Sequence, residues 1–201
     1  MKKLNEIQST MLPLPLSNVD TDQIMPKEFL KRVERSGYGE FLFYDWKKNK
    51  DGSKNIDFPL NKEIYKNAKV LITGENFGTG SSREHAPWGI QDWGFEAVIS
   101  SKFGDIFKNN CLNIGLLALE IEENLIQKII SFINDDPKTK IYISIENKTI
   151  VCRDINIEFD LDVFSQHRLI NGLDLIDITL EHKDSIDNFY SSRFNSLPHL
   201  T

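Results

Sequence analysis

Short apolar runs alternate with helical segments between Ala68 and Asn134, and this alternation limits the folds open to the chain. The runs are short and rich in β-branched residues, as buried strands are, and the segments between them have helical spacing. In chain order we expect a strand at Val70–Thr73, a helix at Arg83–Trp93, a strand at Phe95–Ser100, a helix at Phe103–Asn110, a strand at Leu116–Ile121 and a helix at Asn124–Asn134. This order predicts an α/β fold with a parallel core sheet and helical crossovers.

The regions on either side of this core differ from it. Ile7–Leu16 contains two prolines, which predicts an edge strand, and Pro26–Val33 predicts a short helix. After Pro137 the pattern predicts a hairpin or meander and then a terminal helix, at Ile141–Glu146, Thr149–Val151, Ile155–Asp160 and Ile186–Ser192. We expect one domain over residues 1–201, with an N-terminal part (1–67), an α/β core (68–136) and a β-rich C-terminal part (137–201).

Composition argues against several classes of protein. The chain is 40% hydrophobic and 27% charged with a net charge of −6, which is ordinary for a soluble globular protein. There is no basic stripe for nucleic acid, and the longest apolar runs are too short to span a bilayer. Polar residues and prolines interrupt the N-terminus, where a secretory signal needs a continuous apolar segment. We therefore expect a cytoplasmic protein that binds neither nucleic acid nor membrane.

The cysteine count limits the metal chemistry of this chain. Cys111 and Cys152 are the two cysteines, and we expect them to be reduced. Two thiolates are too few for an iron–sulfur cluster, and no His/Cys group has the spacing of a zinc site. The sequence therefore predicts no metal ligands here, and any metal that takes part must come from elsewhere.

Residues 74–88 carry the strongest functional signal. Gly74, Gly78 and Gly80 allow backbone amides to approach a ligand, because no Cβ stands in the way. Two hydroxyls, an arginine and a histidine follow at the expected start of a helix, where anions are favoured; these are Ser81, Ser82, Arg83 and His85. The sequence therefore predicts an oxyanion site.

Other interpretations of these residues stay open. Ser81 and Glu84 have the spacing of a capping box, although Pro87 would then lie beyond the first helical turn. A nucleotide loop is disfavoured, because no lysine follows Gly80 and the dinucleotide glycine spacing is absent. Asp20-Thr21-Asp22 fits a metal-binding turn less well than a helix cap. His85 is either an acid/base or a structural histidine.

These residues also carry a family resemblance. The 74–88 motif and Asn18-Val19-Asp20-Thr21-Asp22-Gln23-Ile24-Met25-Pro26 resemble the small subunits of 3-isopropylmalate dehydratase, in the aconitase superfamily. The likeness extends to Phe29-Leu30-Lys31-Arg32, to Ser36–Gly39, to Phe41–Trp46, and late in the chain to His167-Arg168 and Asn171–Asp174. Thr79 departs from the pattern, since bacterial members often have cysteine there.

The resemblance implies a swivelling β/β/α domain that closes over a large subunit carrying a 4Fe-4S cluster. It implies activity only in that heterodimer, as a hydro-lyase of leucine biosynthesis that isomerises isopropylmalate, a small dicarboxylate. The implied roles are a catalytic base (Ser81), substrate ligands (Ser82, Arg83, and Arg35 or Arg32), contacts to the isopropyl group (Phe29, Leu30) and a backbone loop for the oxyanion (Gly78, Thr79, Gly80). Homoaconitase and methyl- or dimethylmalate dehydratase small subunits are alternatives, and so is a stand-alone small-anion binding module.

Overall fold

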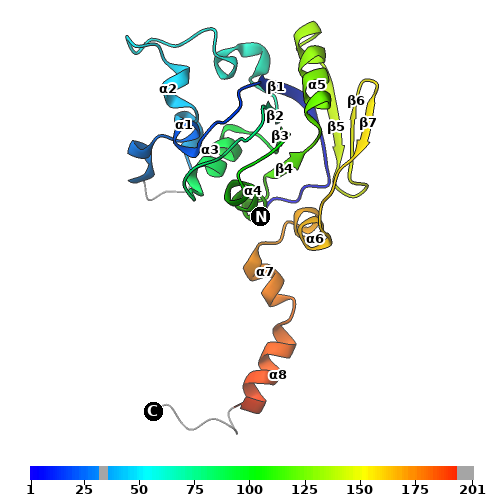
Figure 1. Ribbon diagram of the computed structural model, residues 1–201. Helices are drawn as coiled ribbons and strands as arrows, with labels where there is room; N and C mark the ends of the chain where they lie inside the picture. Colours follow the sequence, from blue (N-terminus) through cyan, green and yellow to red (C-terminus); the bar gives the residue numbers. More distant parts are fainter. Residues whose placement is uncertain (32–35, 194–201) are drawn as a thin grey trace.

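A single mixed sheet organises the molecule (Figure 1). The computed structural model describes residues 1–31 and 36–193. Within them the strand order is β4-β3-β2-β1-β5-β6-β7. The strands are β1 (Glu6–Leu14), β2 (Val70–Thr73), β3 (Ala97–Ser100), β4 (Leu117–Glu120), β5 (Lys140–Ser144), β6 (Thr149–Cys152) and β7 (Ile155–Glu158). Strands β1 to β4 are parallel, and β5 to β7 continue from β1 as an antiparallel meander. The predicted parallel core and meander are both confirmed.

Helices cover both faces of the parallel half. They are α3 (His85–Trp93), α4 (Asp105–Ile114) and α5 (Glu123–Asp135). Figure 1 shows α3 and α4 on one side of the sheet and α5 on the other. Helix α5 packs on β1, β2 and β3 through a buried isoleucine stripe at Ile126, Ile129, Ile130 and Ile133. Strands buried on both faces are largely apolar, which explains why the first three residues of each of β2, β3 and β4 form a continuous hydrophobic run.

The prediction that β1 is an edge strand is wrong. β1 lies between β2 and β5, in the interior of the sheet. Its ladder to β5 covers Glu6 to Thr10, whereas its ladder to β2 covers Met11 to Leu14. Pro13 therefore lies where β1 has only one neighbour, and a missing N–H costs no bond on the open side. The proline marks the half of the strand that lacks a second partner.

Short helical turns fill the region between β1 and β2. They are α1 (Thr21–Ile24), η1 (Lys27–Lys31), η2 (Tyr38–Phe41), α2 (Tyr44–Lys47), η3 (Pro59–Asn61) and η4 (Glu63–Tyr65), where η denotes a 3-10 helix. Both α1 and η2 pack against α3. The predicted helix at Pro26–Val33 is found as the 3-10 turn η1, and residues 32 and 33 lie outside the described residues. This region thus lies against the N-terminal half of the α/β core.

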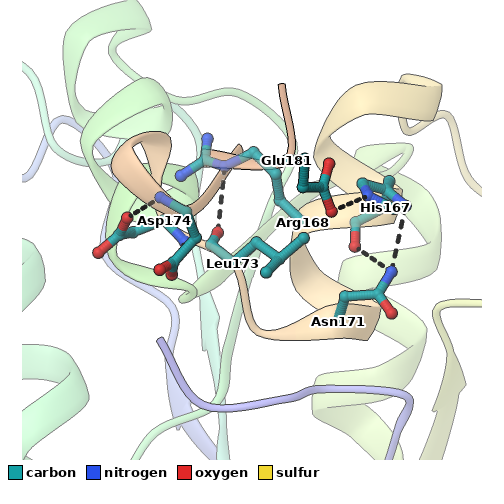
Figure 2. A network of polar contacts seen from close by, with 7 residues as sticks. His167, Arg168, Asn171, Leu173, Asp174 and Glu181 are labelled. Atoms are coloured by element: carbon teal, nitrogen blue, oxygen red, sulfur yellow. Dashed lines mark hydrogen bonds and ion pairs between the residues drawn. The ribbon is translucent and has the colours of Figure 1, made fainter. Parts of the chain in front are cut away.

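Three helices follow the meander: α6 (Val163–Asn171), α7 (Leu175–Leu180) and α8 (Lys183–Arg193). Of these, the sequence predicts only part of α8, at Ile186–Ser192. Figure 1 shows α7 and α8 extending away from the sheet. Polar contacts fix the α6–α7 turn (Figure 2): Arg168 Nε donates to the Leu173 carbonyl at 3.4 Å, and Asp174 accepts from the Asp177 amide at 2.8 Å. Across this turn, His167 lies 3.4 Å from the Glu181 carboxylate. The late residues of the family resemblance are therefore part of a helix connection.

Candidate active site

The segment 74–84, here called the glycine loop, links the carboxyl end of β2 to α3. Ligands of α/β sheets bind at this end of the strands. The loop is attached to the neighbouring β3–α4 connection by backbone hydrogen bonds: the Phe77 amide donates to the Lys102 carbonyl at 3.0 Å, and the Gly104 amide donates to the Phe77 carbonyl at 2.9 Å. Ser100 Oγ also donates to the Gly74 carbonyl at 2.7 Å. One side of the loop is therefore fixed to the parallel sheet.

The other side of the loop is fixed to the segment that leads into α1. The Gly78 amide donates to the Val19 carbonyl at 2.7 Å, and the Thr21 amide donates to the Thr79 carbonyl at 2.8 Å. Thr21 Oγ1 donates to the Ser81 carbonyl at 3.2 Å. Two motifs that are far apart in the sequence thus form one structure. The Asp20–Asp22 turn is a helix cap, as preferred above, because Asp20 Oδ1 accepts from the Gln23 amide at 2.8 Å.

These contacts change which loop amides can meet an anion. The amides of Gly78 and Thr79 both donate to the Val19 carbonyl, at 2.7 and 3.3 Å. They are therefore engaged within the protein, and the expectation that they receive an oxyanion does not fit this geometry. Gly80 is exposed and has φ +97°, so its amide and those after it are better placed for that role. Thr79 is held through its backbone, which is consistent with a variable side chain there.

Gly78 and Gly80 differ in what surrounds them. Both have positive φ, +76° and +97°, which side chains rarely adopt. A Cβ on Gly78 would lie 2.2 Å from Cγ of the buried Phe107 ring, whereas the nearest atoms to a Cβ on Gly80 are 3.5 Å away. Gly78 is therefore required by packing as well as by conformation, and Gly80 by conformation alone.

We predict that Gly78→Ala destabilises the chain more than Gly80→Ala. The strained conformation alone costs about 1 kcal/mol in Gly80→Ala. Displacement of the Phe107 ring adds about 2 kcal/mol in Gly78→Ala. Urea denaturation of the two purified variants measures this difference, and equal losses would contradict the close approach of Phe107 to the loop.

The hydroxyls of Ser81 and Ser82 lie ahead of α3, on exposed residues. Helix α3 begins at His85, and its N-cap is Glu84, which has helical dihedral angles and no side-chain capping bond. The capping-box interpretation of Ser81 is therefore wrong. Pro87 lies in the first turn of α3, where the missing N–H breaks no helical bond. Both serines are thus in the glycine loop, near the positive end of a helix.

Arg83 is held by an acidic residue of α1. Its Nη1 forms an ion pair with Asp22 Oδ1, and its side chain is only 13% exposed. Lys27 Nζ lies 3.6 Å from the other carboxylate oxygen, Asp22 Oδ2. Sequence reasoning missed Asp22 as a site residue, because a cap explains its local pattern. The signal that could have revealed it is its place in the 18–26 segment, which carries the family resemblance.

His85 is a half-buried residue among aromatic rings. Its ring centre lies 5.4 Å from that of Tyr38 and 4.7 Å from that of Trp88. Burial lowers the pKa of His85 below its ordinary value; the Arg83 charge lowers the pKa too, and the Glu84 charge raises it. The imidazole is therefore neutral at pH 7, so it can accept a proton but is a poor proton donor.

We predict that His85 titrates below 6.5, its ordinary pKa, in the folded chain. NMR titration measures this, with the His85 signal assigned by its loss in His85→Gln. As pH falls, the unfolded chain binds a proton at this histidine before the folded chain does. The contribution of His85 to the free energy of unfolding is therefore complete above pH 6.5 and is lost as pH falls through the folded pKa. A midpoint at or above 6.5 would contradict the burial of the ring.

The proposed contacts to the substrate side chain lie on η1. Phe29 stacks on Phe41 with ring centres 4.1 Å apart and meets Tyr44 edge-on at 4.8 Å. Leu30 is half-buried and packs against the core beside it. Arg32 and Arg35 lie outside the described residues. The structure thus provides an apolar cluster at the start of this segment.

The described residues do not fit an iron–sulfur cluster. Among them, no group of three or more His, Cys, Asp or Glu side chains could hold a metal ion. Cys111 and Cys152 are both unpaired and buried, and burial raises the pKa of each thiol, which disfavours the thiolate that a cluster needs. In the same part of the chain, no helix has the length and apolar character to cross a membrane.

Comparison with known proteins agrees with this architecture. Residues 1–124 match the family model of the aconitase C-terminal domain. A crystal structure of a 3-isopropylmalate dehydratase from Methanocaldococcus jannaschii superposes with a TM-score of 0.65 at 22% identity, over 91% of this chain and 98% of that one. The fold is therefore that of the aconitase C-terminal domain.

Closer relatives are 3-isopropylmalate dehydratase small subunits. The one from Rubrobacter xylanophilus is 42% identical over 98% of both chains. The one from Koribacter versatilis is 44% identical over 94% of this chain and 97% of the relative. This chain belongs to the family of 3-isopropylmalate dehydratase small subunits.

Proposed function

We propose that this chain is the small subunit of a hydro-lyase that interconverts 2-isopropylmalate and 3-isopropylmalate through 2-isopropylmaleate, in leucine biosynthesis. The observation that carries the proposal is sequence similarity to a 3-isopropylmalate dehydratase small subunit over nearly the full length, with 42% identity over 98% of both chains. The exposed residue Ser81 and the ion-paired Arg83, which lie two positions apart in the glycine loop, support it. Homoaconitase and methyl- or dimethylmalate dehydratases are the related alternatives.

Ser81 is the base in this proposal. Its carbonyl is bound by Thr21 Oγ1, which fixes the backbone, while its residue is exposed. A serine becomes a base when its alkoxide is stabilised. The exposed backbone from Gly80 and the N-terminus of α3 provide positive potential for that purpose. Ser81 Oγ then takes a proton from the carbon next to a substrate carboxylate, and the electron pair forms the double bond as hydroxide leaves the neighbouring carbon.

The remaining residues bind and orient the substrate. Arg83 binds a substrate carboxylate through its planar guanidinium, and Ser82 donates a hydrogen bond. Phe29 and Leu30 contact the isopropyl group, since they present apolar surface on η1. We assign the second carboxylate to Arg35 or Arg32, which follow η1 in the sequence. His85, neutral among aromatic rings, positions the start of α3.

The reaction needs a second chain in this proposal. Relatives are named small subunits, which implies a large subunit, and we propose that a 4Fe-4S cluster on it would supply the Lewis acid for the hydroxyl. We place the complex in the cytoplasm, where buried unpaired cysteines are stable. We treat residues 1–201 as one domain, because strands from the N-terminal part, the α/β core and the C-terminal part share one sheet.

We predict that Ser81→Ala abolishes turnover without unfolding the chain. An exposed loop hydroxyl contributes little to stability, so the free energy of unfolding should change by less than about 0.5 kcal/mol. Loss of the base should lower kcat by at least about 100-fold. The measurement is turnover of the two-chain enzyme and thermal melting on the same sample. Retained turnover would exclude Ser81 as the base.

We predict that the purified chain alone is colourless and inactive, and that activity on isopropylmalate appears when a cluster-bearing large subunit is added. Comparison of kcat/KM for isopropylmalate, homoaconitate and methylmalates then selects among the related hydro-lyases. Calorimetry with a dicarboxylate or phosphate tests the second candidate, a stand-alone anion-binding module. Micromolar binding to the isolated chain, with no gain on adding the partner, would favour that module.

A further inference from the structure

Asp22 is a charged residue at the site to which the reaction assigns no role. It is the second residue of α1, whose start is fixed from both sides by the Asp20–Gln23 capping box: Gln23 N donates to Asp20 Oδ1 at 2.8 Å, and Asp20 N donates to Gln23 Oε1 at 2.9 Å. Thr21 and Ile24 are the buried residues of this helix. The backbone that carries Asp22 is therefore well defined.

The same helix is bound to the glycine loop. Thr21 donates through its amide to the Thr79 carbonyl at 2.8 Å and through Oγ1 to the Ser81 carbonyl at 3.2 Å. Asp22 follows Thr21 directly, so its carboxylate has a fixed place relative to Arg83. The Asp22–Arg83 pair is partly buried, since the arginine side chain is 13% exposed and the aspartate side chain 42%.

A carboxylate at this position has an electrostatic cost for substrate binding. A carboxylate beside a site for a dianion repels the substrate. Arg83 contacts one of its oxygens, and Lys27 lies 3.6 Å from the other, so two cations face a single anion. The net charge of this trio remains positive, and the repulsion is offset locally.

The atoms used by the pair suggest a role for Asp22. Of the contacts that the described residues make with Arg83, the ion pair engages Nη1. A guanidinium has five N–H donors in a planar fork, so a carboxylate held at Nη1 leaves the Nε–Nη2 edge for a second, bidentate carboxylate. Fixing one edge therefore orients the other.

We propose that Asp22 is a positioning residue that orients Arg83 for the substrate carboxylate. This inference rests on the proposed function, in which Arg83 binds substrate. The opposite arrangement is that Asp22 occupies Arg83 in competition with the substrate. The two arrangements predict changes of opposite sign in KM when Asp22 loses its charge.

The first test is Asp22→Asn in the two-chain enzyme. The amide keeps the size of the side chain and removes the charge that holds the guanidinium. Because Arg83 would bind ground state and transition state alike, we expect KM for isopropylmalate to rise about 10-fold with kcat changed less than about 3-fold. Asp22→Glu should restore part of the loss. Asp57→Asn, the same charge change on an exposed loop residue, is the matched control and should leave KM unchanged.

The second test is a double-mutant cycle in which only the binding of an unreactive substrate analogue is measured. Calorimetry with isopropylsuccinate, which lacks the hydroxyl and cannot react, measures the dissociation constant for the wild type, Asp22→Asn, Arg83→Gln and the double variant. If Asp22 acts through Arg83, its substitution should weaken binding about 10-fold in the wild type and less than about 2-fold when Arg83 is already Gln. A purely structural role would weaken both backgrounds equally.

The outcomes separate the two proposals. A KM that falls or stays unchanged in Asp22→Asn, or equal effects in both backgrounds of the cycle, overturns the positioning role while the enzyme itself remains active. A wild-type complex that turns over none of the malate analogues overturns the proposed function instead. Melting curves of each variant test whether a loss of substrate affinity comes from unfolding of the chain.

Discussion

The backbone hydrogen bonds between the α1 segment and the glycine loop are the constraint on which the site depends. Val19 accepts from Gly78, and Thr21 both donates to Thr79 and holds the Ser81 carbonyl. The β3–α4 connection fixes the opposite side of the loop through Phe77. The loop is thus held on two sides by backbone hydrogen bonds and by the hydroxyls of Thr21 and Ser100, so the side chains of Ser81 and Ser82 do not have to stabilise it. Backbone atoms of the loop hold its conformation, and the proposed function uses the side chains of the same loop.

That division also sets the electrostatics. Two loop amides, those of Gly78 and Thr79, are consumed in holding the loop, so the positive potential at the serines comes from the exposed backbone after them and from the N-terminus of α3. Arg83 adds a full charge, and Asp22 takes part of that charge back. In our proposal, the cost of the acidic residue is offset because a guanidinium in one orientation recognises a carboxylate more selectively than a mobile one.

The sequence predicted those elements whose residues carry a local periodic pattern. The alternating core from β2 to α5 has the expected order, with boundaries shifted by a few residues, because buried strands and amphipathic helices carry their own periodicity. The interior position of β1 could not be predicted, since its neighbour β5 lies more than a hundred residues later in the chain and Pro13 resembles an edge signal. Asp22 was missed for a similar reason: its partner Arg83 is on another motif, and the cap at Asp20 already explained the local pattern. Pairings between distant segments have no local signature.

In the proposed function, the way the loop is anchored makes an enzyme divided between two chains workable. The proposed function assigns roles to Ser81, Ser82 and Arg83, which lie in one loop that this chain anchors by itself. In the proposed function, binding a partner then does not have to order these three residues. If the partner had to order the serines, the conformational entropy lost on binding would weaken the affinity between the two chains. In the proposed function, anchoring the loop through α1 therefore serves assembly as well as catalysis.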